Sequence, residues 1–289
     1  MVSGWSVGTV AVAGGVGLRS WGVCETFRVI SIEELERVAA PGWRGVEEEP
    51  LGDWLLRSAE GFTGRANSAL AAGDPGLPVA AAAERVTAWY RARGLPGMIA
   101  VPYPAGEPHR SALDVALAGL GWTLRARPAM VMIAAADHLV NADVTDGGPA
   151  SAAGGMIRIE IDSEPDEAWL ARYHYAGTQL PPVARRVLLS APWQAFASAR
   201  AGDTTIAIGR VAAAGGWAGL TAIEVDPRWR RRGLGAAVST ALAGAARRQG
   251  ANWLYLQVAD GNHAAMALYA RLGFTAHHGY HYRVAPAPS

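Results

Sequence analysis

Hydrophobic and polar residues follow two different periods in the second half of the chain, from about residue 156 onward. Short stretches alternate at every second residue or are continuously apolar, as in strands, and longer ones repeat every third and fourth residue, as on one face of a helix. The pattern predicts strands at residues 156–161, 193–199, 204–212, 217–225, 253–258 and 274–284. It predicts helices at residues 165–174, 181–189 and 234–248, and a last one with Ala265, Leu268, Tyr269 and Leu272 on one face.

The first half has elements of the same kinds. The pattern predicts strands at residues 26–30, 54–59, 62–69, 97–101 and 129–135. One helix begins at Ser31, where Glu34 stands three residues later and completes a capping box. A second helix has one apolar face, made of Val79, Ala82, Ala83, Val86, Trp89 and Tyr90.

The two halves share landmarks in the same order and at a nearly constant offset. A Gly-Leu pair at residues 76–77 corresponds to one at 233–234, and each pair is followed by a helix, a glycine and a strand. A Gly-Trp pair at residues 121–122 corresponds to Gly-Phe at 273–274. This order favours a duplicated domain, and the alternative is that Ala- and Gly-rich α/β sequence resembles itself by chance.

The repeat divides the chain into four segments. Residues 25–140 form a first domain and residues 156–289 a second, and residues 141–155 join them as a linker without periodicity. Residues 1–24 form a loose, apolar, glycine-rich leader. Because the leader has no basic start and its apolar run is broken by glycines, we expect neither a signal peptide nor a membrane span.

Charge and cysteine content limit the partners and the compartment. The formal net charge is +1 over 289 residues, and all 26 basic residues are arginines because the chain contains no lysine. No global field favours nucleic acid or an anionic membrane, so neither is an expected partner. Cys24 is the single cysteine, which excludes an internal disulfide and fits the cytoplasm.

The sharpest local signal is the arginine-rich loop at residues 226–236, between the strand that ends at Val225 and the long helix. At a helix start several backbone N–H groups have no intrahelical partner, and the helix dipole favours an anion. Gly233 and Gly235 let a phosphate approach the backbone, and the arginines can neutralise a diphosphate. The loop fits neither a Walker motif nor a dinucleotide fingerprint. We predict phosphate binding, and the alternative is a solvated basic loop.

Two segments resemble signatures of the GCN5-related N-acetyltransferase (GNAT) superfamily. Residues 230–236, Arg-Arg-Arg-Gly-Leu-Gly-Ala, resemble its acetyl-coenzyme A motif, Arg/Gln-x-x-Gly-x-Gly/Ala. Residues 262–274 resemble its next signature, Asn-x-x-Ala-x-x-Leu-Tyr-x-x-x-Gly-Phe. The resemblance covers about residues 156–285 and implies an acetyl-CoA-dependent N-acetyltransferase.

The fold that this resemblance implies is α/β (α+β), with a mixed, mostly antiparallel sheet flanked by helices. Together with the repeat, it implies two GNAT-like folds in tandem. The strands around Glu224 and Val258 would splay apart, and the pantetheine arm would lie in the gap.

The resemblance also assigns roles to residues. Backbone groups of Ile223 and Val225 would pair with pantetheine, and amides in the loop would hold the diphosphate. Tyr269 would donate a proton to the leaving thiolate, and the alternative for it is a core aromatic. The residues expected to bind acetyl-CoA are Ile223, Val225, Arg230, Arg231, Arg232, Gly233, Leu234, Gly235, Ala236 and Asn262.

A general base must deprotonate the incoming ammonium, directly or through water. Glu224 precedes the phosphate loop and is the predicted base, although it can also point away from the cofactor. The alternatives are His174, His263, His277, His278 and His281. No cysteine or carboxylate completes a metal-ligand spacing with these histidines, so no metal is expected.

The whole chain resembles a narrower group, actinobacterial N-acetylglutamate synthase-like proteins. The segments that carry this resemblance are residues 51–57, 61–68, 173–175, 180–184 and 281–283. The first half would then be a degenerate GNAT-like domain. Its loop at residues 73–78 is acidic and carries prolines where amides should face phosphate, so it should not bind coenzyme A.

The expected reaction moves acetyl from acetyl-CoA to the amine of a small molecule, with glutamate as the first candidate. Arg65, Arg172 and Arg186 are predicted to bind its carboxylates, and the alternative is that they are solvated surface residues. Other acceptors are a peptide or protein N-terminus or a different amine. A non-catalytic, acyl-CoA-binding regulatory module is the non-enzyme alternative, which the intact Tyr269 disfavours.

Overall fold

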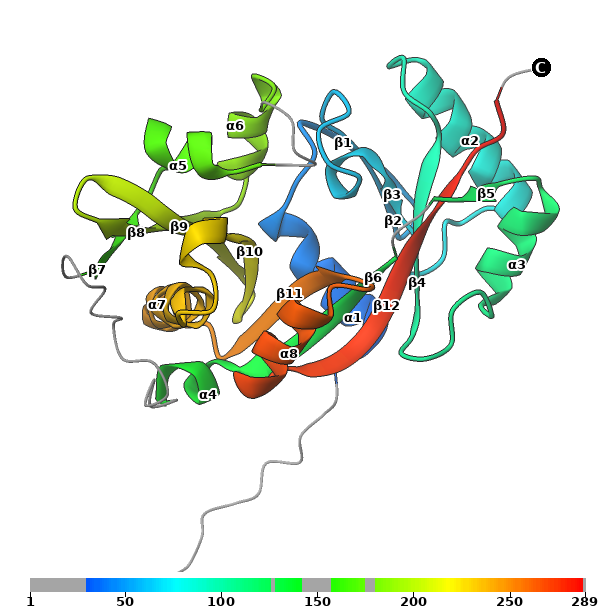
Figure 1. Ribbon diagram of the computed structural model, residues 1–289. Helices are drawn as coiled ribbons and strands as arrows, with labels where there is room; N and C mark the ends of the chain where they lie inside the picture. Colours follow the sequence, from blue (N-terminus) through cyan, green and yellow to red (C-terminus); the bar gives the residue numbers. More distant parts are fainter. Residues whose placement is uncertain (1–29, 126–127, 142–156, 175–179, 288–289) are drawn as a thin grey trace, which may run out of the picture. The chain divides into compact units, whose positions relative to one another are not determined.

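One sheet of twelve strands runs through both halves of the chain in the computed structural model (Figure 1). The structure describes residues 30–125, 128–141, 157–174 and 180–287. The strands follow the order β1-β2-β3-β4-β12-β6-β11-β10-β9-β8-β7, and β5 pairs with β12 beside this path. Pairs β10–β11 and β3–β4 are parallel, and the other pairs among the described residues are antiparallel. The predicted mixed, mostly antiparallel sheet is therefore confirmed.

The elements have the following bounds. The strands are β1 Glu47–Leu51, β2 Trp54–Ser58, β3 Ala69–Leu70, β4 Met98–Pro104, β5 Thr123–Leu124, β6 Ala129–Ala135, β7 Ile157–Asp162, β8 Trp193–Ala201, β9 Thr204–Ala214, β10 Trp217–Val225, β11 Trp253–Ala259 and β12 Thr275–Val284. The helices are α1 Ile32–Ala39, α2 Val79–Arg91, α3 Ala112–Gly119, α4 Ala136–Asn141, α5 Glu167–Arg172, α6 Val183–Leu188, α7 Leu234–Arg248 and α8 His263–Arg271. Short 3-10 turns lie at η1 Ala40–Gly42, η2 Arg65–Asn67 and η4 Pro227–Trp229.

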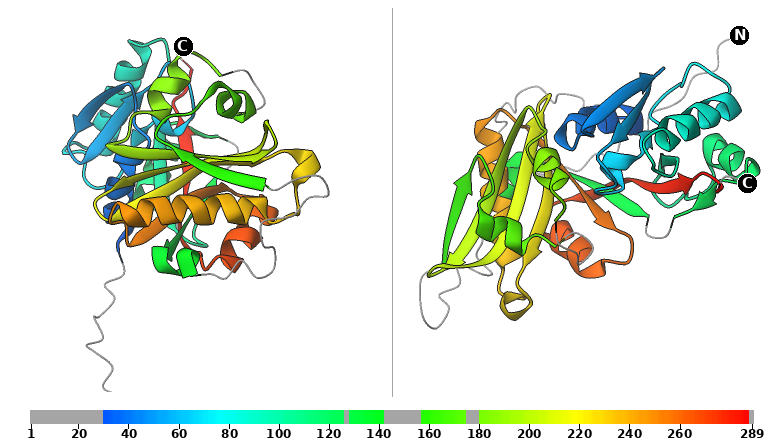
Figure 2. Two further views of the ribbon diagram at one scale, coloured as in Figure 1. Left: turned by 90° about the vertical axis from the view of Figure 1, so that its left-hand side faces the viewer. Right: turned by 90° about the horizontal axis from the view of Figure 1, so that it is seen from above.

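Helices cover both faces of the sheet in the second half. Helices α5 and α6 lie over one face, and α7 runs along the other (Figures 1 and 2). Val238 and Leu242 of α7 are wholly buried in the main core, together with Ile206 and Val211 of β9. Burial of such side chains stabilises the fold by roughly 1.5–3 kcal/mol each. Among the described residues no helix is both long and apolar enough to cross a membrane.

The two halves exchange their closing strands. Strand β6, which ends the first half, pairs with β11 of the second half along its whole length, from Ala129 opposite Ala259 to Ala135 opposite Trp253. Strand β12, which ends the second half, pairs with β4 of the first half and with β6. The sequence predicts two domains at 25–140 and 156–289, but residues from Ser31 onward form one unit with one sheet. The predicted boundary between the halves is not a boundary between separate sheets.

Side chains also tie the first half to the second. The η1 turn after α1 and the loop before β3 bring Trp43, Phe62 and Ala66 into an apolar cluster with Trp169 and Phe196 of the second half. Strand β12 adds an ion-paired network, because the buried Asp114 of α3 accepts hydrogen bonds from Arg283 and His281. Although burial alone raises the pKa of the Asp114 carboxyl, these hydrogen bonds hold its pKa below the ordinary value.

Most predicted elements are confirmed with small shifts at their ends. The long helix at 234–248 and the strands at 129–135 and 217–225 have the predicted bounds. The Ser31 hydroxyl accepts from the Glu34 amide and the Glu34 carboxylate accepts from the Ser31 amide, which confirms the capping box. The strand predicted at 26–30 and the linker lie largely outside the described residues.

The strand predicted at residues 62–69 is wrong. This segment is a loop with the η2 turn, and only Ala69 and Leu70 pair as β3. The backbone φ of Thr63 is 60°, a left-handed value outside regular strand geometry. The Asn67 side chain accepts from the amides of Ala59 and Gly61 and so fixes the loop. The pattern also missed β1 and β5.

Because each half completes the other's sheet, neither is expected to fold alone. A fragment of residues 156–289 would expose the full edge of β11 and leave β12 without β4, and such edges aggregate. We expect this fragment to be insoluble by itself and soluble when co-expressed with residues 25–140, as measured by co-purification. A full-length chain cut by a protease within residues 142–155 is the control and should stay associated. A folded, monomeric fragment of residues 156–289 would contradict the exchange.

Candidate active site

The parallel strands β10 and β11 pair at one end and part at the other. They are in register from Trp217 opposite Trp253 to Leu220 opposite Leu256, and no further pair follows within these described strands. Beyond Leu220, β10 pairs only with β9, with an irregularity between Thr221 and Glu224. Ala222 in this irregularity has a φ of 53°, as in a β-bulge that bends the strand. The expected separation of the strands around Glu224 and Val258 is therefore present in the structure. The gap between β10 and β11 beyond Leu220 is called the splay below.

The loop from β10 to α7 offers free backbone amides beside this splay. Gly233 is the N-cap of α7 with a φ of 75° and has no side-chain cap, so no side chain satisfies the first-turn amides from Leu234 to Ala236. Arg231 also has a positive φ, 61°. Successive backbone N–H groups in such a conformation form a concave anion-binding site. A Cβ added at Gly235 would lie 3.1 Å from Leu268 Cδ2, so this position has little room for a side chain.

The arginines of the loop are exposed around these amides. Arg230, Arg231 and Arg232 are all exposed, and Arg232 stacks on the Trp229 ring with 4.9 Å between its Cζ atom and the ring centroid. Hydrogen bonds from Arg228 and the nearby Arg172 hold the pKa of Asp226 well below its usual range. Strong positive charge and free amides together suit a diphosphate.

Tyr269 lies on α8 next to the start of α7. Its ring packs edge-on against Phe274, and its phenol has a side-chain hydrogen bond with Ser239. The Ser239 hydroxyl in turn donates to the backbone oxygen of Gly235, at 2.8 Å. Burial raises the pKa of Tyr269 to about 12, so the phenol keeps its proton near neutral pH. The structure therefore places a buried proton donor one helical turn from the amides of the loop.

Asn262 and Glu224 have local hydrogen bonds of their own. The Asn262 side chain accepts from the Ala265 amide and caps α8. The Glu224 carboxylate is partly exposed and accepts from the His174 amide at 3.1 Å. Partial burial raises the pKa of Glu224, against the effect of the His174 groups. A carboxylate with a raised pKa is a better base near neutral pH.

A cavity of about 560 Å³ opens where the splay meets the first half. Strand β10 contributes Leu220, Thr221 and Ala222, and β11 contributes Gln257 and Ala259. The remaining lining residues, from the first half, the Tyr173 segment and β12, are Trp43, Thr63, Gly64, Arg65, Arg125, Ala129, Tyr173, Tyr280 and Tyr282. Among the described residues, the lining contains two arginines and no Asp or Glu.

Two arginines lie on the Trp43 indole beside this cavity. The Cζ atoms of Arg65 and Arg210 are 5.6 Å and 5.2 Å from the ring centroid. Arg65 Nε and Arg210 Nη2 are buried atoms without a hydrogen-bond partner among the described residues. Burial lowers the pKa of Arg210 to about 10, and it still carries its charge at neutral pH. Sequence reasoning missed Arg210, although a single charged residue inside the apolar run of β9 was a usable signal.

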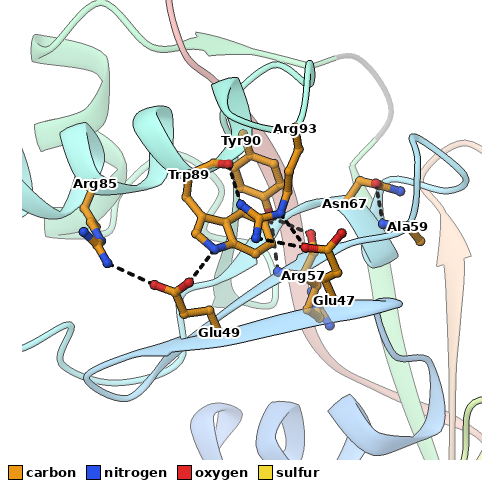
Figure 3. A network of polar contacts seen from close by, with 9 residues as sticks. All are labelled: Glu47, Glu49, Arg57, Ala59, Asn67, Arg85, Trp89, Tyr90 and Arg93. Carbon is orange, nitrogen blue, oxygen red and sulfur yellow. Dashed lines mark hydrogen bonds and ion pairs between the residues drawn. The ribbon is translucent and has the colours of Figure 1, made fainter.

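The loop that carries Arg65 is held rigidly by its neighbours. Asn67 uses its carbonyl oxygen for Ala59 and Gly61 and donates from its amide nitrogen to the backbone oxygens of Phe62 and Thr63. Figure 3 shows Asn67 beside Ala59, with the neighbouring polar contacts between α2, β1 and β2. These hydrogen bonds hold the loop in place, and the loop places the predicted acceptor-binding residue Arg65 in the cavity.

The other two predicted acceptor-binding arginines are not brought to the cavity. Arg172 lies 3.1 Å from the Asp226 carboxylate, and Arg186 is exposed and lies 3.6 Å from Glu60. The first half's loop at residues 73–78 already binds carboxylates of its own chain: Asp74 donates its amide to Asp53, and Gly76 donates to the Asp74 side chain.

The alternative histidines do not line the cavity. His278 is buried against Glu36, and His277 lies beside His278. His281 lies near Asp114 and His109, and ligand atoms of these three residues fall within 4.8 Å of one another. Arg283 donates to both oxygens of Asp114, so this group is an ion-paired network between α3 and β12.

Known proteins share this fold and sequence pattern. The chain is 26% identical over 267 residues to an uncharacterized N-acetyltransferase, YobR, of Bacillus subtilis, covering 88% of this chain and 98% of that protein. A GCN5-related N-acetyltransferase from Kribbella flavida superposes with a TM-score of 0.55 at 18% identity, covering 88% and 93% of the two chains. A tandem GNAT protein from the clavulanic acid biosynthesis pathway superposes with a TM-score of 0.53 at 17% identity, covering 69% and 67%.

A family described as "Probable histone acetyltransferase Rv0428c C-terminal" matches residues 30–283, which is most of the chain. The match spans both halves and includes the splay, the arginine-rich loop and the cavity. The chain belongs to this family, within the GNAT superfamily, and is an N-acetyltransferase.

Proposed function

We propose that this enzyme transfers acetyl from acetyl-CoA to the primary amine of a small molecule that carries carboxylates, with glutamate as the first candidate. The observation that carries the proposal is the arrangement around the splay. An uncapped helix start with exposed arginines lies at one end, and a cavity lined by arginines and without a carboxylate lies at the other.

The donor fits the residues beside the splay. The amides of residues 231–236 and the arginines of the loop would hold the diphosphate of acetyl-CoA. The edge of β10 beyond Leu220 has no β11 partner, so the backbone of Ile223 and Val225 can pair with pantetheine. The first half's corresponding loop satisfies its amides with Asp53 and Asp74, which supports one donor site per chain.

The reaction removes two protons from the acceptor ammonium and gives one to the thiolate, so one proton is released. Glu224, acting through water, would take the proton from the ammonium, and the free amine would then attack the thioester carbonyl carbon. As the carbon–sulfur bond breaks, the Tyr269 phenol would give its proton to the departing sulfur, and the second proton lost by the nitrogen would restore the phenol. The high pKa of Tyr269 keeps that proton available.

The size and charge of the cavity support a small, anionic acceptor. Its volume of about 560 Å³ is within the usual range for small-molecule sites. The unpartnered Nε of Arg65 offers a donor for a carboxylate, and Arg125 adds a second positive charge. The family description names a probable histone acetyltransferase, but a lysine side chain would bring a cation to a cationic cavity. The narrower resemblance to N-acetylglutamate synthases stays a prediction.

Thiol release tests this assignment against its alternatives. Purified protein with saturating acetyl-CoA is assayed against glutamate, other amino acids, an aminoglycoside and a peptide with a free N-terminus. We expect turnover with glutamate or another carboxylated amine. Turnover with the peptide alone would favour the peptide alternative, and acetyl-CoA binding without turnover on any amine would favour a regulatory module.

Gly235→Pro should weaken acetyl-CoA binding by at least about tenfold, because it removes an amide donor to a charged group and adds bulk beside Leu268. Calorimetry should give one site per wild-type chain. Gly244→Ala is the control, since a Cβ there meets only the Arg248 side chain, at 3.7 Å. Wild-type affinity in a folded Gly235→Pro protein, or a second site, would contradict the assignment of the loop.

Tyr269→Phe should lower kcat by roughly 10²–10⁴-fold, the usual cost of a lost general acid, with acetyl-CoA affinity unchanged. The ring and its packing on Phe274 are kept, so stability should change little. Tyr103→Phe, on β4 outside the cavity lining, is the matched control. If kcat is unchanged while the chemical step limits the rate, Tyr269 is a core residue only.

Arg65→Ala should raise the KM for glutamate by about tenfold or more and leave the KM for acetyl-CoA unchanged, because a charged hydrogen bond to the carboxylate is lost. Arg186→Ala is the comparison, since Arg186 is exposed and lies near Glu60. Steady-state kinetics, with the concentrations of glutamate and acetyl-CoA varied in turn, give the two KM values for each variant. If Arg186→Ala raises the KM for glutamate and Arg65→Ala does not, the acceptor binds outside the cavity.

A further inference from the structure

A buried acid–imidazole pair joins the two halves and has no role in the reaction described above. Glu36 of α1 is 7% exposed and His278 of β12 is wholly buried. His278 Nε2 lies 2.7 Å from Glu36 Oε1. Burying an ionisable pair in the core costs desolvation free energy, so a role that offsets this cost is expected.

The pair continues toward the outside through a second imidazole. His277 Nδ1 lies 2.8 Å from His278 Nδ1, and the two rings meet edge-on. Successive residues of a strand normally face opposite sides of the sheet. Here the pairing of β12 with β6 slips between Ala276 and His278, and this bulge brings the two rings together. The His277 ring is partly exposed, so the chain of groups reaches toward solvent.

On its inner side the pair faces a small void next to the acceptor cavity. The void measures about 10 Å³, close to the space of one water molecule. Glu36 lines it, and it shares Arg65, Gln257, Tyr280 and Tyr282 with the cavity. Tyr280 donates to Gln257 in this shared wall. One wall of polar side chains therefore separates the acceptor from Glu36.

The reaction must export a proton from this region. An ammonium and acetyl-CoA give an amide, free coenzyme A and one proton, so each turnover releases one proton at the cavity. The charged and titratable groups around Glu36 are Arg57 of β2, Arg65 of η2, Tyr255 of β11 and His278 of β12. Among the described residues that line the void, Glu36 is the carboxylate.

We propose that Glu36, His278 and His277 form a route by which the proton that Glu224 takes from the acceptor ammonium is passed on, through water in the cavity, to solvent. The proposal rests on the acetyl transfer proposed above. These three are positioning and relay residues, and they do not touch the reacting atoms. The proton would reach Glu36 through a water in the void.

The chain of groups has two hydrogen-bonded arrangements that differ by one proton. With Glu36 protonated, the acid donates to His278 Nε2, His278 Nδ1–H donates to His277 Nδ1, and His277 carries its proton on Nε2. The Glu36 O–H bond then breaks as the His278 Nε2–H bond forms. The His278 Nδ1–H bond breaks as the His277 Nδ1–H bond forms, and the His277 Nε2 proton leaves to water. Tautomer exchange of the two rings, together with the next proton taken up by Glu36, restores the first arrangement.

The test measures kcat against buffer concentration, with acetyl-CoA and the most rapidly acetylated amine of the panel. Glu36→Gln keeps the shape and a hydrogen-bond acceptor but cannot carry a proton. His277→Ala removes the imidazole at the solvent end of the proposed route. We expect kcat of either variant to fall at least tenfold in dilute buffer. It should recover as imidazole buffer is added, in proportion to the buffer's basic form, with KM for acetyl-CoA unchanged.

The controls separate a relay from a structural role. Wild type and Glu33→Gln, an exposed change on the same helix, should show no dependence on buffer. If Glu36→Gln does not fold, His277→Ala carries the test, because that ring is partly exposed. Wild-type kcat and no buffer dependence in folded His277→Ala and Glu36→Gln proteins would overturn the relay. The acetyl transfer itself would still stand, since it fails only if the wild type acetylates no amine of the panel.

Discussion

Strands β10 and β11 pair over four residues and then part, and the remaining features of the site are arranged around that opening. The bulge at Ala222 turns β10 toward β9, while β11 stays paired with β6 over its full length. A β10 edge without a strand partner keeps backbone groups that need hydrogen bonds, and an extended ligand arm can supply them. The splay also leads from the loop at the start of α7 to the cavity, so one opening connects the two places proposed for the donor and the acceptor.

The exchange of closing strands makes the first half a structural part of the sheet, although its loop at residues 73–78 is acidic and carries prolines. Without β6, the strand β11 would have a free edge, and the splay would lose one of its walls. The first half also supplies Trp43 and Arg65 to the cavity. It acts in this account as a structural partner and as the acceptor side of the site. In the proposed function, donor binding falls to the second half and acceptor recognition largely to the first.

The sequence predicted most elements of the second half because their signals are local. The apolar stripe of α7 and the glycines at its start lie within a few turns, and helical periodicity detects them directly. The strand exchange was not predictable in this way, because periodicity says which residues form strands and not which distant strands pair. Residues 62–69 have a strand-like composition, but the left-handed Thr63 and the hydrogen bonds of Asn67 give a loop. The buried pair Glu36–His278 depends on the exchange, since α1 and β12 meet only in the assembled sheet.

The most direct test of the proposed donor and acceptor sites is a crystal structure of the full chain with coenzyme A and glutamate. The account predicts the diphosphate on the amides of residues 231–236 and the pantetheine arm along β10 beyond Leu220. The thiol should point toward the cavity, with a glutamate carboxylate on Arg65. Coenzyme A bound at residues 73–78, or a pantetheine arm outside the gap between β10 and β11, would contradict it.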